Sequence, residues 1–338
     1  MKPGVYITID VECSMGGAWK DPGLCPVPPS RAVWGEYNDN KFGLPLITDI
    51  LNRNKLAATF FVEAFMDEQG YPGKSEPICR FLLDKGQDVQ LHIHPNNKHY
   101  ALSLQRKPYP FTDQISDLTP DAQRALLKEG CERITRWTGR PPVAFRAGNM
   151  GASEETLEQL AAIGMQIDSS YSFPMAGGQC RFSSEEPYNG SRWYGGVLEL
   201  ALSGFHQARL PGMHSSKPLD LMGISFQECR DAIQRICGQG ADAVLILHSF
   251  SLFKVRNLQY HRGRPNRVVA SRLRRLCQWL RDNSVAYPTR TFAELARTIA
   301  TSQYQANAAP PCKLTGPRAI LRALTRKAVQ AGNRFYWA

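Results

Sequence analysis

The sequence predicts an α/β fold in which parallel strands alternate with helices. Five short segments with strand-like composition end in, or run directly into, polar residues: 5–9, 88–94, 142–145, 165–167 and 243–247. Helical periodicity lies between some of them, at 123–138 and 154–163. The order of strand and helix favours a parallel sheet, and in a parallel barrel the carboxyl ends of the strands carry the active site. The polar residues at these ends are therefore predicted to be functional.

An acidic pair follows the first strand. Residues 5–9 are mostly β-branched or aromatic, and Asp10 and Glu12 come next, before Gly16 and Gly17. Side chains two positions apart on a strand point to the same face. Asp10 and Glu12 are thus expected to point toward one site.

A histidine pair with the same spacing ends a second strand. His92 and His94 close the segment 88–94, and Pro95 stops it. Two neutral imidazoles and one carboxylate, with an open fourth position, form the usual ligand set of a hydrolytic zinc ion. A second carboxylate beside the ion could act as the general base. The competing interpretation is a histidine pair that only hydrogen-bonds the backbone of a loop.

The chain resembles the polysaccharide deacetylases, carbohydrate esterase family four, over roughly residues 4–300. The resemblance is carried by an ordered series of motifs, at 8–12, 58–62, 92–95, 145–148, 168–171 and 245–248. It implies a distorted (β/α) barrel, usually with seven strands. It also implies metal-dependent removal of an acetyl group from a sugar, with zinc as the expected ion.

The resemblance also implies a role for each polar motif residue. Asp10 would be the general base and Arg146 would hold it, while His248 would be the general acid, oriented by Asp168. Glu12, His92 and His94 would be the metal ligands. Amide hydrolysis needs these functions in any case: an activated water, a Lewis acid on the carbonyl oxygen and a proton for the leaving amine.

Five further residues are predicted to bind the substrate. Leu245 and Leu247 would form the wall of the pocket for the acetyl methyl group, and Tyr171 belongs to the same motif as Asp168. Arg262 and Arg264 lie in a loop that follows His248 and contains Gly and Pro. This loop is interpreted as binding the phosphates of a pyrophosphate-lipid or nucleotide-sugar carrier.

Two motifs depart from the commonest family pattern. One residue separates Asp10 from Glu12, where the family usually has adjacent aspartates, so the base and ligand roles could be exchanged. The histidines are two residues apart rather than four, which leaves His99 as an alternative ligand to His94. Such variants are similar to a branch found with lipopolysaccharide and exopolysaccharide biosynthesis. The resemblance therefore implies an intracellular sugar-lipid or nucleotide-sugar substrate.

Composition indicates a cytosolic protein. The first strand begins within five residues of Met1, which leaves no room for a signal peptide, and no apolar run is long enough to span a membrane. Nine cysteines without C-x-x-C spacing favour reduced thiols over a disulfide framework. We therefore expect a cytoplasmic protein, with peripheral contact to the inner face of the membrane left open.

Three segments are predicted from changes in composition. Residues 1–300 form the barrel, 301–312 form a polar, proline-containing linker, and 313–338 form a basic tail. A length of 338 residues suits one barrel with extensions.

The tail is predicted to be a basic amphipathic helix. It holds six lysines and arginines and no acidic residue, within a chain of net charge +11. Leu321 and Leu324 share one side at helical spacing, while Arg318, Arg322 and Arg326 share another. Two interpretations stay open: an anchor on an anionic membrane surface, supported by the aromatic residues 335–337, or a helix packed on the barrel with its arginines in solvent.

Three functions remain compatible with the sequence. The first is a zinc-dependent N-deacetylase of an acetylated sugar, and the second is a deformylase or deacylase of another sugar-lipid amide. The third is a catalytically retired barrel that only binds carbohydrate, although every catalytic residue type is retained. A basic run at 254–281 has no accompanying nucleic-acid motif, so no nucleic-acid partner is predicted.

Overall fold

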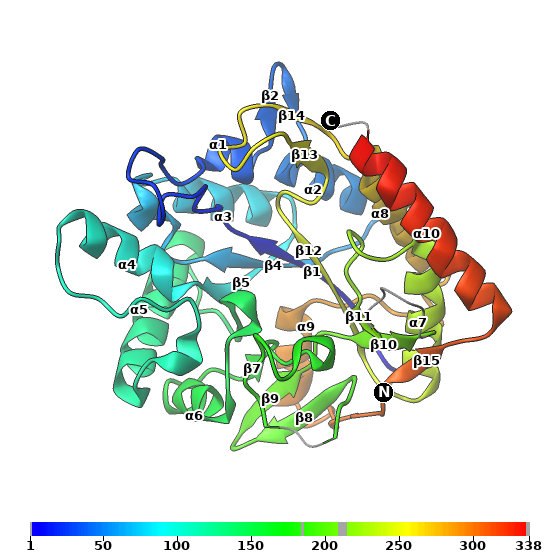
Figure 1. Ribbon diagram of the computed structural model, residues 1–338. Helices are drawn as coiled ribbons and strands as arrows, with labels where there is room; N and C mark the ends of the chain where they lie inside the picture. The colour runs from blue at the N-terminus through cyan, green and yellow to red at the C-terminus, as the bar shows by residue number, and fades with distance from the viewer. Residues whose placement is uncertain (1, 184–185, 209–214, 336–338) are drawn as a thin grey trace.

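The main sheet of the computed structural model curls into an incomplete barrel (Figure 1). The structure describes residues 2–183, 186–208 and 215–335. Within these residues the sheet has eight strands. In spatial order they are β12 (Ala243–His248), β1 (Val5–Val11), β4 (Thr59–Glu63), β5 (Asp88–Ile93), β6 (Ala144–Ala147), β7 (Ile167–Asp168), β9 (Val197–Leu200) and β8 (Ser191–Tyr194).

The strand count corrects the expected seven. Seven of the described strands, β12 through β9, do run parallel to one another. The eighth, β8, pairs antiparallel with β9 in a hairpin, which a seven-stranded pattern leaves out. The outer edge of β12 is covered by irregular chain, because Ser203 N donates to Val244 O (3.1 Å) and Ile246 N donates to Leu219 O (3.1 Å). The barrel is thus closed by two loop segments instead of a strand.

Helices cover the outside of the sheet (Figure 1). The α-helices are α1 (Pro29–Ala32), α2 (Leu44–Arg53), α3 (Ser75–Asp84), α4 (Pro95–Leu104), α5 (Pro120–Thr138), α6 (Glu154–Ala162), α7 (Phe226–Gly238), α8 (Arg267–Asp282), α9 (Phe292–Ala300) and α10 (Pro317–Phe335). Short 3-10 turns are η1 (Met66–Gln69), η2 (Ile115–Asp117), η3 (Gly148–Met150) and η4 (Phe173–Met175).

The central strands are buried on both faces. Every residue of β1, β4 and β5 is buried, as expected for a parallel sheet that has helices on one side and a filled interior on the other. Tyr6 packs edge-on against Phe292 of α9, with ring centroids 5.5 Å apart, and Phe61 does the same at 5.2 Å. This core holds the strand ends at fixed positions.

Three small sheets lie outside the main sheet in the described residues. β10 (Gly204–Gln207) pairs with β11 (Ser216–Pro218) and with β15 (Cys312–Leu314). β13 (Phe253–Val255) pairs with β14 (Gly263–Pro265), and β2 (Glu36–Tyr37) pairs with β3 (Asn40–Lys41). The β13–β14 hairpin lies in the loop that follows β12, so it belongs to the rim at the carboxyl ends of the strands.

The segment predicted as a linker is fixed to the barrel surface. Tyr304 and Asn307 both donate to Asp242 Oδ2, at 2.6 and 2.8 Å. Ala309 forms a bridge with Asn189, and β15 then continues parallel to β10. Two polar residues of the predicted linker, Tyr304 and Asn307, are therefore hydrogen-bond partners of the barrel.

The tail helix α10 packs along the outside of α7 and α8 (Figure 1). Arg326 is buried and donates to Glu228 of α7 (2.6 Å), and Arg322 forms an ion pair with Asp231. The expectation that a packed helix would leave its arginines in solvent is thus wrong for these two residues. Their guanidinium groups face inward because α7 offers carboxylates there. The aromatic residues Tyr336 and Trp337 lie outside the described residues.

No helix in the described parts of the chain is both long and apolar enough to cross a membrane.

Candidate metal centre and active site

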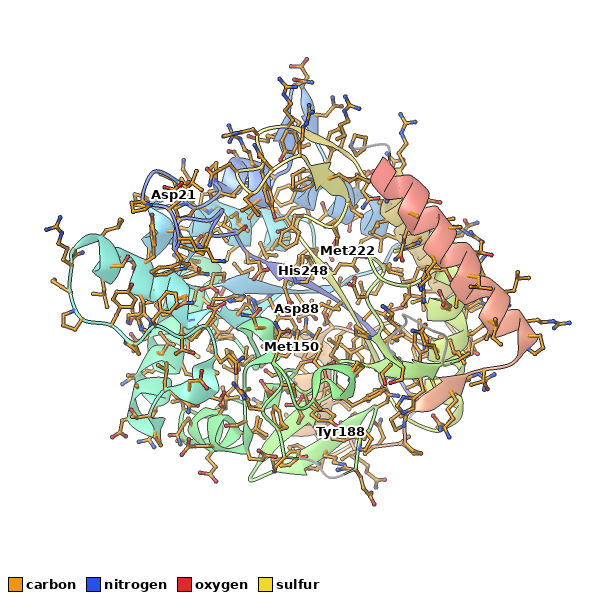
Figure 2. The ribbon with its side chains drawn as sticks, viewed as in Figure 1. Asp21, Asp88, Met150, Tyr188, Met222 and His248 are labelled. Atoms are coloured by element: carbon orange, nitrogen blue, oxygen red, sulfur yellow. The ribbon has the colours of Figure 1, made fainter. Side chains whose placement is uncertain are left out.

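The register of the parallel strands brings the predicted site residues together. Asp10 at the end of β1 is paired with His248 at the end of β12. On the other side, His92 of β5 lies between Glu63 of β4 and Arg146 of β6. Figure 2 labels His248 near the centre of the ring of strands. Residues that are far apart in the sequence are thus adjacent at one end of the barrel.

Three of these side chains form a candidate metal site. Glu12 Oε2 lies 2.7 Å from His94 Nε2 and 3.4 Å from His92 Nε2. One ligand atom from each of Glu12, His92 and His94 lies within 4.8 Å of the others. Within the described residues they are the one such group of three or more His, Cys, Asp or Glu side chains. Two histidines and one carboxylate match the donor set of a hydrolytic zinc site.

The outer nitrogens of both histidines are already bonded. His92 Nδ1 lies 2.8 Å from the carbonyl oxygen of Arg146, and His94 Nδ1 lies 2.9 Å from Asp113 Oδ2. Carbonyl and carboxylate oxygens only accept, so each Nδ1 carries the proton. Each Nε2 then faces Glu12, which is the arrangement by which proteins fix metal-ligating histidines.

The position of His94 is determined by its neighbours. Its backbone N–H donates to Glu63 Oε2 (2.7 Å), and a Cβ on Gly148 would come within 2.5 Å of its ring. Only glycine leaves room for the imidazole at that point. Asn149 adopts a left-handed φ of 54° directly after it and donates to Asp113 Oδ2 (2.7 Å).

The three candidate ligands form a charged group when no ion is bound. Burial lowers the pKa of His94, but the charges of Glu12 and Asp113 outweigh it and raise that pKa well above its usual value. Burial raises the pKa of Glu12, yet His94 and the hydrogen bonds from both histidines hold it well below its usual range. A cation can therefore replace a proton between these residues.

Asp10 is held separately from this group. Arg146 is fully buried over the ring of Phe61, and its Nη1 donates to Asp10 Oδ1 (2.7 Å) and to Thr8 Oγ1 (2.8 Å). Its Nε donates to Ser169 O (3.0 Å), which fixes the plane of the guanidinium. Asp10 Oδ2 has no hydrogen-bond partner among the described residues. One oxygen of Asp10 is thus positioned and the other is available.

His248 lies across the site from His94. Its Nε2 is 3.8 Å from Glu12 Oε1, its side chain is 29% exposed, and its ring stacks on Phe250. His248 Nδ1 is buried without a hydrogen-bond partner in the described structure. The nearby buried carboxylate is Asp220, whose pKa burial raises and the charge of His248 lowers in part.

The predicted orienting residue, Asp168, does not reach His248. Its two carboxylate oxygens accept from the Ser170 hydroxyl (2.8 Å) and the Ser170 backbone N–H (3.0 Å). It also shares a buried site with Glu199, and burial together with the charge of Asp168 raises the pKa of Glu199 well above its usual value. Asp168 therefore supports the loop after β7, and the carboxylate that shares a cavity with His248 is Asp220.

A cavity of about 180 Å³ opens between these groups. Ile246, Met150 and Met175 supply apolar wall, while Asp220 and His248 supply polar wall on one side. The predicted wall residues Leu245 and Leu247 are fully buried and do not line it. Side chains along a strand alternate between its two faces. Ile246 is therefore on the same face as His248, while Leu245 and Leu247 are on the opposite face. The residue on that side of the cavity is thus Ile246.

The other predicted substrate residues lie elsewhere. Tyr171 is buried and stacks on Tyr188, with ring centroids 4.4 Å apart. Arg262 and Arg264 are exposed at the β13–β14 hairpin and do not line the cavity. His99 lies on α4 beside Tyr109 and is not part of the group of potential ligands, which contains His94 instead.

Four residues of the site were missed from the sequence. Glu63 ends a strand, just as Asp10 follows one, so the same rule could have found it. Ile246 could have been found from its spacing to His248. Asp113 and Asp220 come from segments without a regular pattern, and the local sequence carries no signal of their positions.

Comparison with known proteins agrees with this fold. Residues 29–167 match the family model of polysaccharide deacetylase. A Mycobacterium smegmatis protein assigned as a polysaccharide deacetylase has a similar structure, with a TM-score of 0.57 and 18% identity over 94% of this chain and 95% of that one. No curated protein matches the sequence significantly.

Two more distant structures are also similar in part. The family 4 carbohydrate esterase from Streptomyces lividans, solved with acetate, has a TM-score of 0.41 and 13% identity over 83% of this chain and 89% of that one. The peptidoglycan deacetylase PdaC from Bacillus subtilis has a TM-score of 0.40 and 14% identity over 89% of this chain and 94% of that one.

The family-model match over residues 29–167 supports a hydrolase of the polysaccharide deacetylase type, which acts on amide bonds. Residues 29–167 thus resemble the polysaccharide deacetylase family, as the ordered motifs predicted.

Proposed function

We propose that the protein is a metal-dependent sugar N-deacetylase whose ion is held by Glu12, His92 and His94. The observation that carries this proposal is that both histidines have their outer nitrogens bonded and their inner nitrogens directed at Glu12. When bound, a divalent ion, most simply Zn²⁺, would polarise the acetyl carbonyl and lower the pKa of a water to about 7.

Asp10 is the proposed general base. Arg146 positions one of its oxygens, and the other has no described partner, so it can accept a proton from the attacking water. Glu12 is less suited to this role because it lies between the two imidazoles.

His248 is the proposed general acid. It lines the cavity on the side away from His94, it is partly exposed, and its Nε2 points toward Glu12. From there it can donate a proton to the leaving amine, which is a poor leaving group without one. The carboxylate residue Asp220 lines the same cavity as His248.

Ile246 and the two methionines would surround the acyl group. The small cavity favours a short acyl chain such as acetyl or formyl over a longer one. We extend the proposal to an acetylated sugar on a lipid or nucleotide carrier, used in cell-surface polysaccharide or lipopolysaccharide biosynthesis. Nine free cysteines favour the cytosol as the place of this reaction.

Amine release from acetylated amino sugars tests the proposal. The protein is stripped with a chelator, reloaded with Zn²⁺, and given chitooligosaccharides and their N-formyl counterparts. Metal-dependent release of acetate with free amine supports the deacetylase, whereas release of formate alone would favour the deformylase.

Metal content is measured on the same samples. His92→Ala should lose both the bound ion and turnover, and His99→Ala should keep both. Bound zinc without turnover of either the acetylated or the formylated substrate would favour a catalytically inactive barrel that only binds carbohydrate. Loss of metal in His99→Ala would show that the ligand set is wrong.

A further inference from the structure

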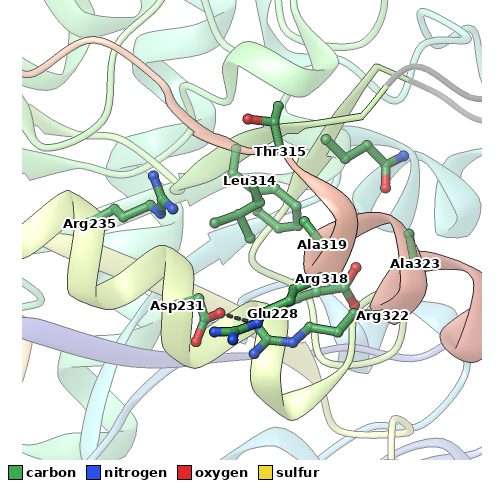
Figure 3. A pocket seen from close by; sticks show the side chains of 11 residues that line it. Glu228, Asp231, Arg235, Leu314, Thr315, Arg318, Ala319, Arg322 and Ala323 are labelled. Atoms are coloured by element: carbon green, nitrogen blue, oxygen red, sulfur yellow. Dashed lines mark hydrogen bonds and ion pairs between the residues drawn. The ribbon is translucent and has the colours of Figure 1, made fainter.

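The helix α10 is attached to the barrel by its polar side. Arg326, 3% exposed, donates to Glu228 (2.6 Å) and to Gln207 (2.9 Å), and Gln330 donates to the carbonyls of Met222 and Gly223. Figure 3 shows Arg322 reaching Asp231 from the same side of the helix. A helix on the surface of a globular protein normally buries its apolar stripe instead.

Three of the larger apolar side chains of α10 are left exposed, although Ala323 is buried. Leu321 is 66% exposed, Leu324 49% and Val329 41%. The neighbouring helix α8 shows the ordinary pattern, because it buries Leu273 and Leu276. The exposed residues of α10 thus form an apolar stripe that the described part of this chain does not cover.

A groove of about 560 Å³ runs beside this stripe, between α10 and the first turns of α7 and α8. We call it the α7–α8–α10 groove. Phe226, Val268, Leu321 and Val329 give it apolar surface, and five arginines line it: Arg267, Arg272, Arg275, Arg322 and Arg326. None of the described residues that line it is Asp or Glu.

Three of these arginines have no carboxylate partner within the described residues. Arg272 is buried and donates to the carbonyl oxygens of Leu221 and Met222. Arg275 lies over the ring of Phe226, 4.5 Å from its centroid, and Arg267 is the exposed first residue of α8. Two helix N-termini also open here, which adds positive potential. The groove is therefore suited to anionic groups next to apolar chains.

We propose that the exposed stripe of α10 and the α7–α8–α10 groove bind the surface of an anionic lipid bilayer. The exposed Arg267 and Arg275 bind lipid phosphates, and Leu321, Leu324 and Val329 enter the region between headgroups and acyl chains. An anionic lipid surface fits Arg267 and Arg275, because both are exposed and neither has a carboxylate partner among the described residues. The net charge of +11 favours the same anionic surface.

The position of the groove connects it to the active site. In the loop from Asp220 to Gly223, Asp220 lines the proposed catalytic cavity. The backbone carbonyls of the residues that follow it accept hydrogen bonds from Arg272 and Gln330. A bilayer on the groove would thus lie next to the loop that forms one cavity wall. This step rests on the proposed function, and it favours a sugar whose carrier is a lipid.

Vesicle binding tests the inference without any turnover. Full-length protein is co-sedimented with phosphatidylcholine vesicles, with and without phosphatidylglycerol. We expect binding only to the anionic vesicles, and a loss of about 10- to 30-fold in partitioning for Arg267→Ala/Arg275→Ala. Leu321→Ser/Val329→Ser should lose about tenfold. All four side chains are on the surface, so these variants should fold.

Matched control variants show whether vesicle binding depends on this particular surface or on the overall charge and hydrophobicity of the protein. Arg53→Ala/Arg80→Ala removes two exposed arginines elsewhere, and Val285→Ser removes an apolar residue that is 81% exposed. Both should bind like the wild type. Hydrolysis of a soluble acetylated sugar should be unchanged in all variants, so failure of the proposed function would show there and not in sedimentation.

Several results would overturn the inference. They are no vesicle binding by the wild type, equal loss in the control variants, or a groove that binds inorganic phosphate while vesicles do not sediment the protein. A change of oligomeric state in Leu321→Ser/Val329→Ser, without a change in vesicle binding, would assign the stripe to a second copy of the chain.

Discussion

The two halves of the active site are held in different ways. In the ligand half, His92 and His94 each have their outer nitrogen bonded, to the Arg146 carbonyl and to Asp113. In the acid half, His248 is partly exposed and its Nδ1 has no hydrogen-bond partner in the described structure. The difference indicates that the geometry of the proposed metal ligands is built into the fold, while the proposed acid, His248, can still adjust to a substrate.

The largest expected effect separates the two halves. His248→Ala should lower kcat by about 10²–10⁴, because the leaving amine loses its proton donor. Zinc content should stay at the wild-type value, since His248 is not part of the ligand group. Metal analysis and steady-state kinetics on the same samples measure both quantities. Loss of the ion in this variant would show that His248 also contributes to metal binding.

Asp113 tests whether the outer bond of His94 matters. Asp113→Asn should weaken zinc binding by about 10- to 100-fold, because the neutral amide holds the imidazole less firmly and reduces its basicity. Competition with a chromophoric chelator measures the affinity. Asp117→Asn, in the same loop but hydrogen-bonded to Thr112, is the matched control. Equal affinities for the two variants would mean that His94 is positioned by other contacts.

The pH dependence of metal binding follows from the paired charges of the ligand half. Without an ion, the raised pKa of His94 keeps its Nε2 protonated near neutral pH, and the ion must displace that proton. Affinity should therefore rise about tenfold per pH unit below that pKa and level off above it. In the metal-free protein, the same charge pair stabilises the fold fully below the ordinary pKa of histidine, and this contribution is lost as pH rises through the raised pKa. A flat affinity profile between pH 6 and about 8 would contradict the charge assignment.

The smallest effect concerns the acyl wall. Ile246→Ala should relax the preference for acetyl over larger acyl groups, by about tenfold in kcat/KM for a propionyl sugar. Leu247→Ala should instead lower the free energy of unfolding by about 2–5 kcal/mol and leave acyl preference unchanged, because Leu247 is buried away from the cavity. Denaturant unfolding and competition between acetyl and propionyl substrates distinguish the two variants. A change of acyl preference in Leu247→Ala and not in Ile246→Ala would show that Leu247 forms the cavity wall.

Sequence patterns predict the fold and the residues at strand ends well. Asp10, Glu12, His92, His94, Arg146 and His248 are brought together because parallel strands end at one rim. Period-two alternation also contained the information for Ile246, which the motif comparison placed one residue away.

Loop positions could not be predicted in the same way. Asp113 and Asp220 reach the site from irregular segments, whose course depends on tertiary contacts such as those of Asn149 and Arg272. The orientation of α10 depends on Glu228 and Asp231 of α7, which the periodicity of the tail alone does not reveal.

The proposed mechanism depends on two different carboxylates: Glu12 binds the ion, and Asp10, held by Arg146, acts as the base. Zinc stoichiometry and turnover of Asp10→Asn and Glu12→Gln, measured side by side, test it most directly. We expect Asp10→Asn to keep its zinc and lose turnover, and Glu12→Gln to lose both. Retained zinc in Glu12→Gln, with turnover preserved in Asp10→Asn, would contradict it and exchange the two roles.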